Sequence, residues 1–386
     1  MLKKNFVKTF FKSEISIGIV LFAATILALL IANSDNHQTY FDFLAIDIDF
    51  SFFGFRENFT IHDFINEALM TLFFLLVGLE LKKEVLIGEL SSKQKIILPA
   101  IAAFGGIIFP ALIFILFNLN DRENLRGFAT PTATDIAFAY GVIVLFGKRI
   151  SNSIKVFLVA LAVLDDLVAI LIIAIFYSQN IDIFYLILAI LPLFFLALLN
   201  YQNCNKILFY LISAVFLWLM ILKSGVHPTL SGVVLALFIP LQVKNESPLS
   251  KLAHKIAPLV NFLILPIFAF ANAGVKIAKF SLEIFMQPLV LGIIFGLFFG
   301  KQLGVMFFSF LAIKLKIANL PRGANWLQLY SAAVFTGIGF TMSLFIGSLA
   351  FIENNSAFNQ IKIGVLSGSL LSVFWGIFLT YFFVKK

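Results

Sequence analysis

The sequence predicts an all-α polytopic membrane protein with about twelve transmembrane helices, in one integral membrane domain over residues 1–386. Of its 386 residues, 61% are hydrophobic and 12% are charged, whereas soluble domains carry about 25% charged residues. Apolar segments long enough to cross a bilayer follow one another along the chain, and basic residues gather in alternate loops. The single cysteine, Cys204, excludes a disulfide framework or a thiolate metal cluster, and we expect no cofactor.

The apolar segments set the expected helices in chain order. They cover residues 14–33, 62–82, 96–118, 124–146, 153–177, 183–200, 206–222, 225–240, 256–274, 288–313, 326–351 and 359–383. The first is too long for a signal-peptide core, and no small-residue cleavage site follows it, so it is expected to remain as a membrane span. We therefore expect a transmembrane region over residues 14–383.

The basic residues indicate how the helices are oriented in the membrane. If the N-terminus is cytoplasmic and each segment crosses once, most of the 28 lysines and arginines fall in cytoplasmic loops. This bias follows the positive-inside rule and predicts that both termini are cytoplasmic. The net charge of +8 therefore reflects membrane topology, and we expect no nucleic-acid partner.

One loop on the predicted outer side has internal structure. In AIDIDFSFFGF, residues 45–55, apolar side chains alternate with Asp47, Asp49 and Ser51, a pattern typical of a β-strand. A turn near Gly54 would complete a short periplasmic β-hairpin over residues 45–58. This hairpin is either an ordered loop or an exposed edge that pairs with a second protomer.

Two adjacent aspartates lie in the middle of the fifth segment. Asp165 and Asp166 stand in the apolar stretch AVLDDLVAI. Each ionised carboxylate at such a depth costs about 2.5–3.5 kcal/mol of insertion free energy. Because ionisable side chains inside a membrane are functional by default, we interpret the pair as an ion and proton site rather than as structural polar residues.

Helix-breaking residues interrupt the fourth and eleventh segments. Pro131 lies in TPTATDIAFAYG, residues 130–141, and Gly337 and Gly339 lie in TGIGFTMS, residues 336–343. Backbone groups freed by such breaks are tolerated in a membrane only against protein or water. Each break falls in the middle member of a triplet, segments 3–5 or 10–12, and the triplets are expected to run in opposite directions. This pattern is typical of inverted-topology repeats in which two broken helices cross at the midplane.

Thr134 and Asp135 lie beside the break of the fourth segment. Two half-helix N-termini that meet at a crossing would carry partial positive charge. A carboxylate has the right sign to compensate this charge, but Asp135 could also bind an ion directly or cap a single helix. Thr134 could support ion binding or charge compensation, or it could donate to a carbonyl of its own helix.

A lysine lies at membrane depth in the tenth segment. Lys301 is about as far into its segment as Asp165 is into the fifth, and pairing is the least costly way to keep either charge in hydrocarbon. A cation there would also suit two half-helix C-termini. Glycines 292, 296, 300 and 304 form a stripe at four-residue spacing. We expect the stripe to pack closely on another helix, with Lys301 at its flank.

Three further titratable residues each allow two interpretations. Glu80, in GLELKKE, either lines the cytoplasmic mouth of a transport path or marks the water boundary. His227, in SGVHPTLSG, has a structural or gating role or senses protons. His254 lies in a basic inner loop, where it is simply solvated or contributes to a pH response. The sequence leaves these alternatives open.

Six motifs together resemble a known family. ATDIAFAYG, ALAVLDDLVAI, LKSGVHPTLSGV, LPIFAFANAG, FGLFFGKQLG and GIGFTMSLFI look like the NhaA-type sodium/proton antiporters, in the right order. The resemblance runs from ALMTLFFLLVGLELKKE through the twelfth segment. It implies a bacterial inner-membrane exchanger of sodium or lithium for protons, with twelve spans and a homodimer formed through the outer hairpin.

The resemblance also implies roles for individual residues. Asp165 and Asp166 would bind the ion and the protons, and Lys301 would be the partner of Asp165. Glu80 would belong to the cytoplasmic funnel. The crossing of the broken helices would contain Thr134, Asp135, Gly337 and Gly339.

One loop departs from the family pattern. Well-studied bacterial members carry a glutamate and a second histidine, linked to pH response, before the ninth span. This chain has KLAHKIAP there, with Ala253 and Ala257 in those places and only His254 remaining. We therefore do not expect strong pH regulation of that kind.

The charges of the two aspartates and of the species that bind them predict a mechanism of ion exchange. Two carboxylates that bind either a hard cation or protons exchange one for the other, and the exchange is electrogenic if more protons enter than sodium ions leave. Alternating access would follow from rocking of one bundle past the other. The alternatives are a proton-coupled carrier of another solute, a cation channel or an intramembrane aspartyl protease. The protease needs two aspartates on facing helices, and no Gly-x-Gly-Asp signature occurs, so we expect a transporter and not an enzyme.

Overall fold

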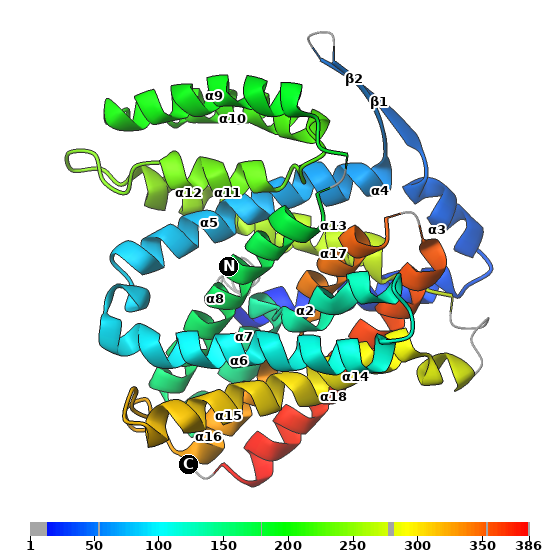
Figure 1. The fold of residues 1–386 in the computed structure, drawn as a ribbon, viewed down its shortest axis with the longest axis vertical. Coiled ribbons are helices and arrows are strands. Elements are labelled where there is room, and N and C mark those ends of the chain that lie inside the picture. Colours follow the sequence, from blue (N-terminus) through cyan, green and yellow to red (C-terminus); the bar gives the residue numbers. More distant parts are fainter. Residues whose placement is uncertain (1–13, 53–54, 179, 277–281, 353, 385–386) are drawn as a thin grey trace, which may run out of the picture. The chain divides into compact units, whose positions relative to one another are not determined.

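The computed structural model describes residues 14–52, 55–178, 180–276, 282–352 and 354–384, which are mostly helical (Figure 1). The chain divides into two compact units. The first contains residues up to 33, residues 89–169 and residues from 272 onward, and the second contains residues 34–88 and 170–271. The chain passes from one unit to the other within two helices, α8 (Asn152–Phe176) and α13 (Leu265–Ala273).

The first unit contains both predicted triplets of segments. Its N-terminal part comprises α2 (Glu14–Ala32), the 3₁₀ turn η2 (Glu89–Ser91), α6 (Lys93–Asn118), the 3₁₀ helix η3 (Asn124–Thr132), α7 (Ile136–Val144), the 3₁₀ turn η4 (Gly147–Arg149) and the start of α8. Its C-terminal part comprises the 3₁₀ turn η7 (Leu282–Met286), α14 (Pro288–Phe295), the π-helical turn η8 (Gly296–Gly300), α15 (Lys301–Lys314), α16 (Trp326–Phe335), α17 (Phe340–Ala350) and α18 (Asn355–Phe382). Segments 3–5 and 10–12, apart from the end of the fifth after residue 169, thus belong to one compact body, as is expected of an inverted repeat.

The second unit contains the strands and the other helices. Its elements are α3 (His37–Leu44), β1 (Asp47–Phe52), β2 (Phe55–Thr60), α4 (Ile61–Phe64), the π turn η1 (Ile65–Leu69), α5 (Met70–Leu86), α9 (Ile183–Tyr201), α10 (Ile207–Lys223), α11 (Leu230–Phe238), α12 (Pro248–Leu259), the π turn η5 (Val260–Ile264) and most of α13. Leu75, Leu217 and Leu235 belong to its apolar core. Helices α5 and α11 pack so closely that a Cβ atom at Gly232 would lie 2.3 Å from the carbonyl oxygen of Thr71.

The predicted membrane spans correspond to helices of the structure. Among the described residues, eight helices are long and apolar enough to cross a membrane, and the bent pair α16–α17 would be a ninth. The remaining predicted segments contain η3 with α7, the shorter apolar helix α10, and α11. The ninth segment begins at Pro248, earlier than predicted, because Ser247 caps the helix and accepts the backbone N–H of Ser250. These helices confirm the predicted fold class.

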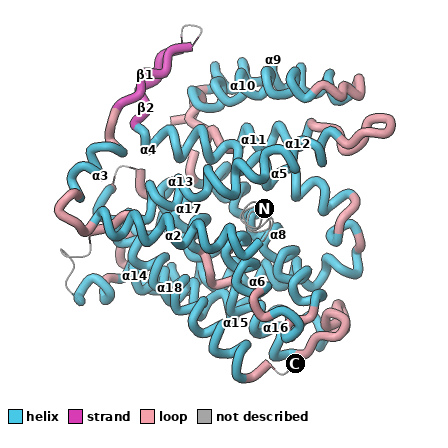
Figure 2. The backbone as a smooth tube through the Cα atoms, turned by 180° about the vertical axis from the view of Figure 1, so that it is seen from behind, coloured by secondary structure: helices cyan, strands magenta, loops and turns pink. Residues whose placement is uncertain are grey.

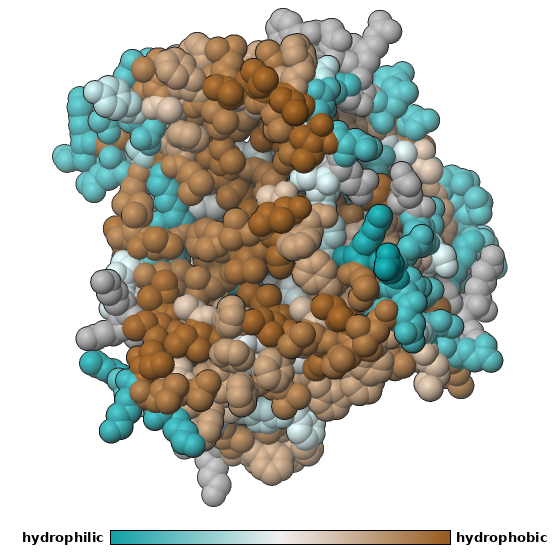
Figure 3. All heavy atoms as spheres, in the orientation of Figure 1, coloured by the Kyte–Doolittle hydropathy of each residue, from teal (hydrophilic) through white to brown (hydrophobic). Residues whose placement is uncertain are grey.

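Apolar side chains cover the surfaces that would face lipid. On α9, the most apolar stretch is only 17% buried. Ile183 exposes 68% of its surface and Phe194 exposes 62%, and brown and tan side chains cover most of this helix in Figure 3. An exposed apolar surface of this extent matches the hydrocarbon of a bilayer better than water.

The two strands form the predicted hairpin. They pair antiparallel, with Asp47 opposite Thr60 and Phe52 opposite Phe55, and appear in magenta in Figure 2. The turn predicted near Gly54 lies outside the described residues, as do the basic residues of both termini. Thr60 ends the hairpin and forms a capping box with Asp63 at the start of α4, so the hairpin leads directly into the second predicted segment.

Candidate functional site

The fourth predicted segment breaks beside Pro131. The 3₁₀ helix η3 ends at Thr132, and α7 begins at Ile136. Proline lacks a backbone N–H and disrupts a continuous α-helix. Asp135 is the N-cap of α7, and its Oδ1 accepts the backbone N–H of Phe138 at 2.9 Å. The break therefore leaves Thr134 and Asp135 in non-helical backbone, where both are buried.

The eleventh predicted segment breaks at its two glycines. Helix α16 ends at Phe335, α17 begins at Phe340, and the pair is bent by 43°. A Cβ atom at Gly337 would lie 2.6 Å from the carbonyl oxygen of Leu297, and one at Gly339 would lie 2.7 Å from the Leu297 side chain. Only glycine fits such close approaches. These contacts confirm that both predicted segments are broken helices.

The two breaks contact each other within the first unit. The backbone N–H of Asp135 donates to the carbonyl oxygen of Ile338 at 2.7 Å. Asp135 Oδ2 accepts the backbone N–H of Thr341 at 3.1 Å and also its hydroxyl. The Asp135 carboxylate therefore caps α7 through Phe138 and α17 through Thr341. One negative charge meets the positive ends of two helix dipoles, so the geometry favours charge compensation combined with capping.

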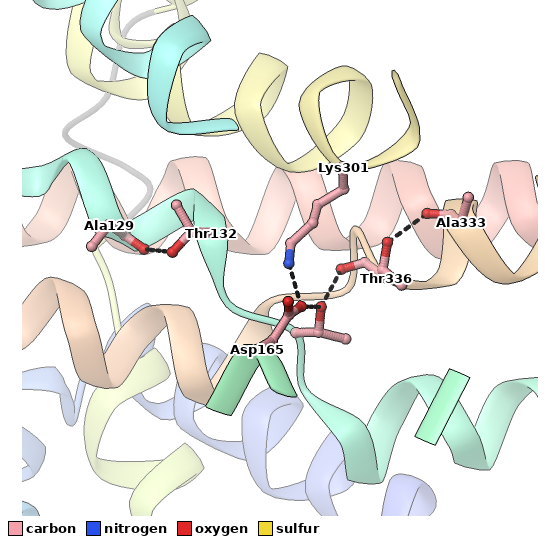
Figure 4. Close-up of polar contacts among 7 residues, drawn as sticks. Ala129, Thr132, Asp165, Lys301, Ala333 and Thr336 are labelled. Carbon is pink, nitrogen blue, oxygen red and sulfur yellow. Dashed lines mark hydrogen bonds and ion pairs between the residues drawn. The ribbon is translucent and has the colours of Figure 1, made fainter. Parts of the chain in front are cut away.

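Asp165 and Lys301 form an ion pair beside this crossing. Lys301 Nζ lies 2.5 Å from Asp165 Oδ2, and both side chains are fully buried. Thr134 Oγ1 lies 2.7 Å from the same carboxylate oxygen and 2.9 Å from the carbonyl oxygen of Thr336. Figure 4 shows Lys301 reaching from its helix to Asp165, with Thr336 close by. Asp165 thus links α8 to α15 and to the break of the fourth segment, and Thr134 extends this contact to the eleventh segment.

Two other threonines near the crossing bond locally. Thr132 Oγ1 donates to the carbonyl oxygen of Ala129 at 2.8 Å, and Thr336 Oγ1 donates to that of Ala333 at 2.7 Å (Figure 4). Both bonds satisfy carbonyls near a helix end. Thr134 instead reaches from one break to the other, which is not the local back-bonding considered for it.

The predicted glycine stripe packs against α6. A Cβ atom at Gly304 would lie 2.1 Å from the carbonyl oxygen of Gly105, and one at Gly300 would lie 2.7 Å from Pro110 Cα. The two helix backbones are therefore in direct contact. The π turn η8 ends immediately before Lys301, and such turns frequently occur at functional sites. Backbone contact with α6 fixes the part of α15 that carries Lys301.

The remaining predicted residues differ in their surroundings. Asp166 is 1% exposed and leaves α8 about 100° from Asp165. Glu80, His227 and His254 belong to the second unit. Glu80 lies on α5, His227 Nδ1 lies 2.8 Å from Thr229 Oγ1, and His254 is exposed on α12. Within the first unit, the structure brings together Thr134, Asp135, Asp165 and Lys301.

Two contacts at the crossing were not expected from the sequence. One is the hydroxyl of Thr341 on Asp135, and the other is the carbonyl oxygen of Thr336 beside Thr134. Both threonines flank the glycines of TGIGFTMS. A hydroxyl or a freed carbonyl next to a helix break is the available signal, because broken backbone in a membrane must find polar partners.

Comparison with known proteins finds relatives along nearly the whole chain. The family described as Na+/H+ antiporter 1 matches residues 8–380. A protein of Pelagibacter ubique named Na(+)/H(+) antiporter NhaA is 48% identical over 381 residues, which are 98% of this chain and 98% of that protein. The protein of the same name from Nitrobacter hamburgensis is 50% identical over 372 residues, covering 95% of this chain and 89% of the relative. That from Campylobacter curvus is 45% identical over 383 residues, covering 99% and 96%.

Proposed function

The chain belongs to the Na+/H+ antiporter 1 family, and on that premise we propose that it is a secondary transporter that exchanges cytoplasmic Na+ or Li+ for external H+. Exchange takes place at Asp165 and Asp166, with Lys301 as the charge partner of Asp165. The broken helices hold this site through Thr134, Asp135, Gly337 and Gly339. The protein is a transporter and not an enzyme.

The ion pair between Asp165 and Lys301 supports this proposal most directly. Replacing a buried ion pair by apolar residues is often neutral or stabilising, so such a pair is weak support for a purely structural role. Inside a membrane segment an ionisable pair is functional by default. Its position against two broken helices matches the substrate site of a secondary transporter.

Oxygen atoms around Asp165 suit a hard cation such as Na+. Asp165 Oδ1 makes no hydrogen bond within the described residues, and Asp166 adds a second carboxylate. Among the described residues no group of three or more His, Cys, Asp or Glu side chains could hold a metal ion together. The transported cation would therefore complete its shell with hydroxyl, carbonyl or water oxygens.

Competition between the cation and protons drives the exchange. Cation and proton occupy the same carboxylates in turn, so binding of one releases the other. If two protons replace one Na+, net charge crosses the membrane and the membrane potential contributes to transport. Alternating access follows when the crossing of broken helices opens to each side in turn.

The proposal also covers the membrane location of the protein, its oligomeric state and its response to pH. The bias of basic residues supports an inner-membrane location with both termini in the cytoplasm. The exposed edge of the β1–β2 hairpin suits pairing with a second protomer, which would give a homodimer. Glu80 would lie at the cytoplasmic funnel, and His227 and His254 are candidates for a pH response.

Three alternatives are less well supported. An aspartyl protease needs two free facing carboxylates, but three donors already occupy Asp135. A cation channel would show conductance above transporter turnover. A proton-coupled carrier of another solute would require a substrate other than Na+ or Li+ to drive proton flux.

Sodium-driven proton flux in liposomes tests the proposal. The purified protein is reconstituted with a trapped pH indicator, a proton gradient is imposed and NaCl is added. We expect Na+-dependent dissipation of the gradient, which Asp166→Asn abolishes. Asp121→Asn is the matched control, because an amide oxygen can still accept the backbone N–H groups that Asp121 Oδ1 accepts. Absence of flux over a broad pH range would contradict antiport, and normal flux in Asp166→Asn would contradict the site.

A further inference from the structure

Three side chains form a series of hydrogen bonds that ends at the residue directly after Lys301. Trp375 Nε1 is 3.2 Å from the hydroxyl oxygen of Tyr330, and that hydroxyl is 2.9 Å from Gln302 Oε1. The three residues come from α18, α16 and α15 of the first unit. Gln302 follows Lys301 directly in the sequence and is only 6% exposed. The chain of hydrogen bonds thus begins one residue away from the charge partner of Asp165.

The donors fix the direction of this chain. An indole N–H can only donate, so the Tyr330 oxygen accepts from Trp375. The single Tyr330 proton is then free to donate to Gln302 Oε1. With the amide reversed, the Tyr330 oxygen would receive two donors while its own proton lost this acceptor. Trp375 and Tyr330 therefore favour the orientation in which Gln302 presents its amide oxygen.

This orientation is costly for Gln302. Its Nε2 is buried and makes no hydrogen bond to any of the described residues. A buried amide donor without an acceptor is rare and destabilising. The bond from Tyr330 is thus kept in spite of an unsatisfied donor. Such a cost is expected where the position of a helix matters for function.

These hydrogen bonds join α15, which supplies Lys301 to Asp165, to α16, which ends beside the contact between Thr336 and Thr134. Helix α15 carries Lys301, whose side chain leaves the helix about 100° from that of Gln302. Helix α16 ends at Phe335, directly before Thr336, whose carbonyl oxygen lies against Thr134. Lys301 and Thr134 both contact Asp165 Oδ2. A shift of α15 against α16 would therefore move Lys301 relative to Thr134 around this oxygen.

We infer that Tyr330 and Gln302 are positioning residues for cation binding, which hold Lys301 and the broken end of α16 in register around Asp165. This role rests on the proposed exchange at Asp165 and Asp166. Neither residue touches the carboxylate. They act by fixing how α15 is rotated about its axis and shifted along it relative to α16. Gln302 lies on the side of α15 away from the glycines that pack against α6.

Sodium kinetics of Tyr330→Phe in liposomes test this role. Removing one hydroxyl leaves the ring in place but removes the hydrogen bond between α15 and α16. We expect the KM for Na+ to rise about 3- to 10-fold, the size expected for one or two hydrogen bonds. The maximal rate per folded molecule should change less than about twofold. A merely structural role would lower the amount of folded protein and leave KM unchanged.

A double-mutant cycle identifies the bond itself. Gln302→Met removes the acceptor at similar volume, and we expect it to raise KM as Tyr330→Phe does. The double variant should then be no worse than the more affected single variant. Tyr381→Phe is the matched control, because the Tyr381 hydroxyl lies on the exposed end of α18 and is not part of these hydrogen bonds. The KM of this variant for Na+ should equal that of the wild type.

The outcomes separate this inference from the proposed function. Wild-type flux together with an unchanged KM in Tyr330→Phe, or additive effects in the double variant, would overturn the positioning role alone. No Na+-dependent flux in the wild type would overturn the exchange function and the positioning role with it. If Tyr330→Phe does not accumulate in the membrane, Trp375→Phe replaces it. A KM increase of about twofold in that variant supports the role, and an unchanged KM contradicts it.

Discussion

Asp135 and Asp165 are carboxylates of one unit that are equally buried, each 2% exposed, but differ in their partners. Asp135 accepts hydrogen bonds from two backbone N–H groups and one hydroxyl. Asp165 faces the ammonium group of Lys301 and the hydroxyl of Thr134 through one oxygen, while its other oxygen has no hydrogen bond within the described chain. Fixed backbone donors compensate the first charge, and side chains compensate the second.

If exchange occurs at Asp165 as proposed, the difference separates a charge that belongs to the fold from one that is available to a ligand. The donors around Asp135 are helix N-termini, which cannot leave without unfolding two helices. Lys301 is a long side chain that a competing cation can displace electrostatically. Burial alone therefore does not identify a transport site, because the identity and mobility of the partners decide whether a carboxylate can exchange its counter-charge.

The largest effect is expected from Asp165→Asn. This change removes the negative charge and leaves the Lys301 ammonium buried without its partner, a loss of about 3–5 kcal/mol. We expect Na+-dependent proton flux to fall at least about 100-fold. The matched substitution Asp135→Asn should retain more of the flux, because its one amide oxygen still accepts from one of the two helix ends that Asp135 caps through separate oxygens. Equal loss of flux in both variants would remove the distinction between the two carboxylates.

Asp135→Ala should instead affect stability. It removes the N-cap of α7 and the acceptor for the first turn of α17, and each cap contributes about 0.5–2 kcal/mol. We expect the free energy of unfolding in detergent to fall by about 1–4 kcal/mol, measured by thermal or denaturant unfolding. Asp135→Asn should lose much less. Full stability of Asp135→Ala would show that the two helix ends do not depend on this carboxylate.

Gly304→Ala tests how the position of Lys301 affects Asp165, with both aspartates unchanged. A Cβ atom there would lie 2.1 Å from the carbonyl oxygen of Gly105, so α15 must move away from α6 and carry Lys301 with it. Overpacking of this kind costs about 1–3 kcal/mol. We expect a lower unfolding midpoint and a higher KM for Na+. Gly18→Ala on α2 is the control, since nothing lies within 4 Å of a Cβ atom at that position.

The smallest effect is expected from Thr341→Val. It removes one hydroxyl from Asp135 but keeps the backbone N–H of residue 341, so stability should fall by about 1 kcal/mol. Exchange should remain close to that of the wild type. Thr134→Val provides the contrast on the Asp165 side, where loss of the hydroxyl should raise the KM for Na+ severalfold. If the two valine variants have the same KM, the hydroxyls do not distinguish the carboxylates.

Local patterns in the sequence predicted the helices and their interruptions. Apolar runs, Pro131 and the pair Gly337 and Gly339 act on their own segments, so their effects do not depend on distant residues. The glycine stripe of the tenth segment similarly predicted close packing on another helix, but not that this helix is α6. Six motifs indicated the family, which the match over residues 8–380 confirms.

The extent of individual helices was less predictable. The eighth predicted segment contains only the short helix Leu230–Phe238, and the ninth begins at Pro248 rather than residue 256. Hydropathy reports burial in an apolar environment and not hydrogen bonding, so caps and turns inside an apolar run are not visible to it.

The sequence by itself determined the membrane class, the order of the helices, the two breaks and the buried charges Asp135, Asp165, Asp166 and Lys301, but it placed Lys362, which is only 6% exposed, in an outer loop. It also indicated that Lys301 and Asp165 lie at similar depth, because each position can be counted along its own segment. Only the tertiary structure decided that Asp135 caps two helices, that Thr134 reaches Thr336, and that Tyr330 orients Gln302. Each of these contacts joins segments far apart in the chain, and their directions depend on helix rotation, which packing sets and hydropathy does not encode.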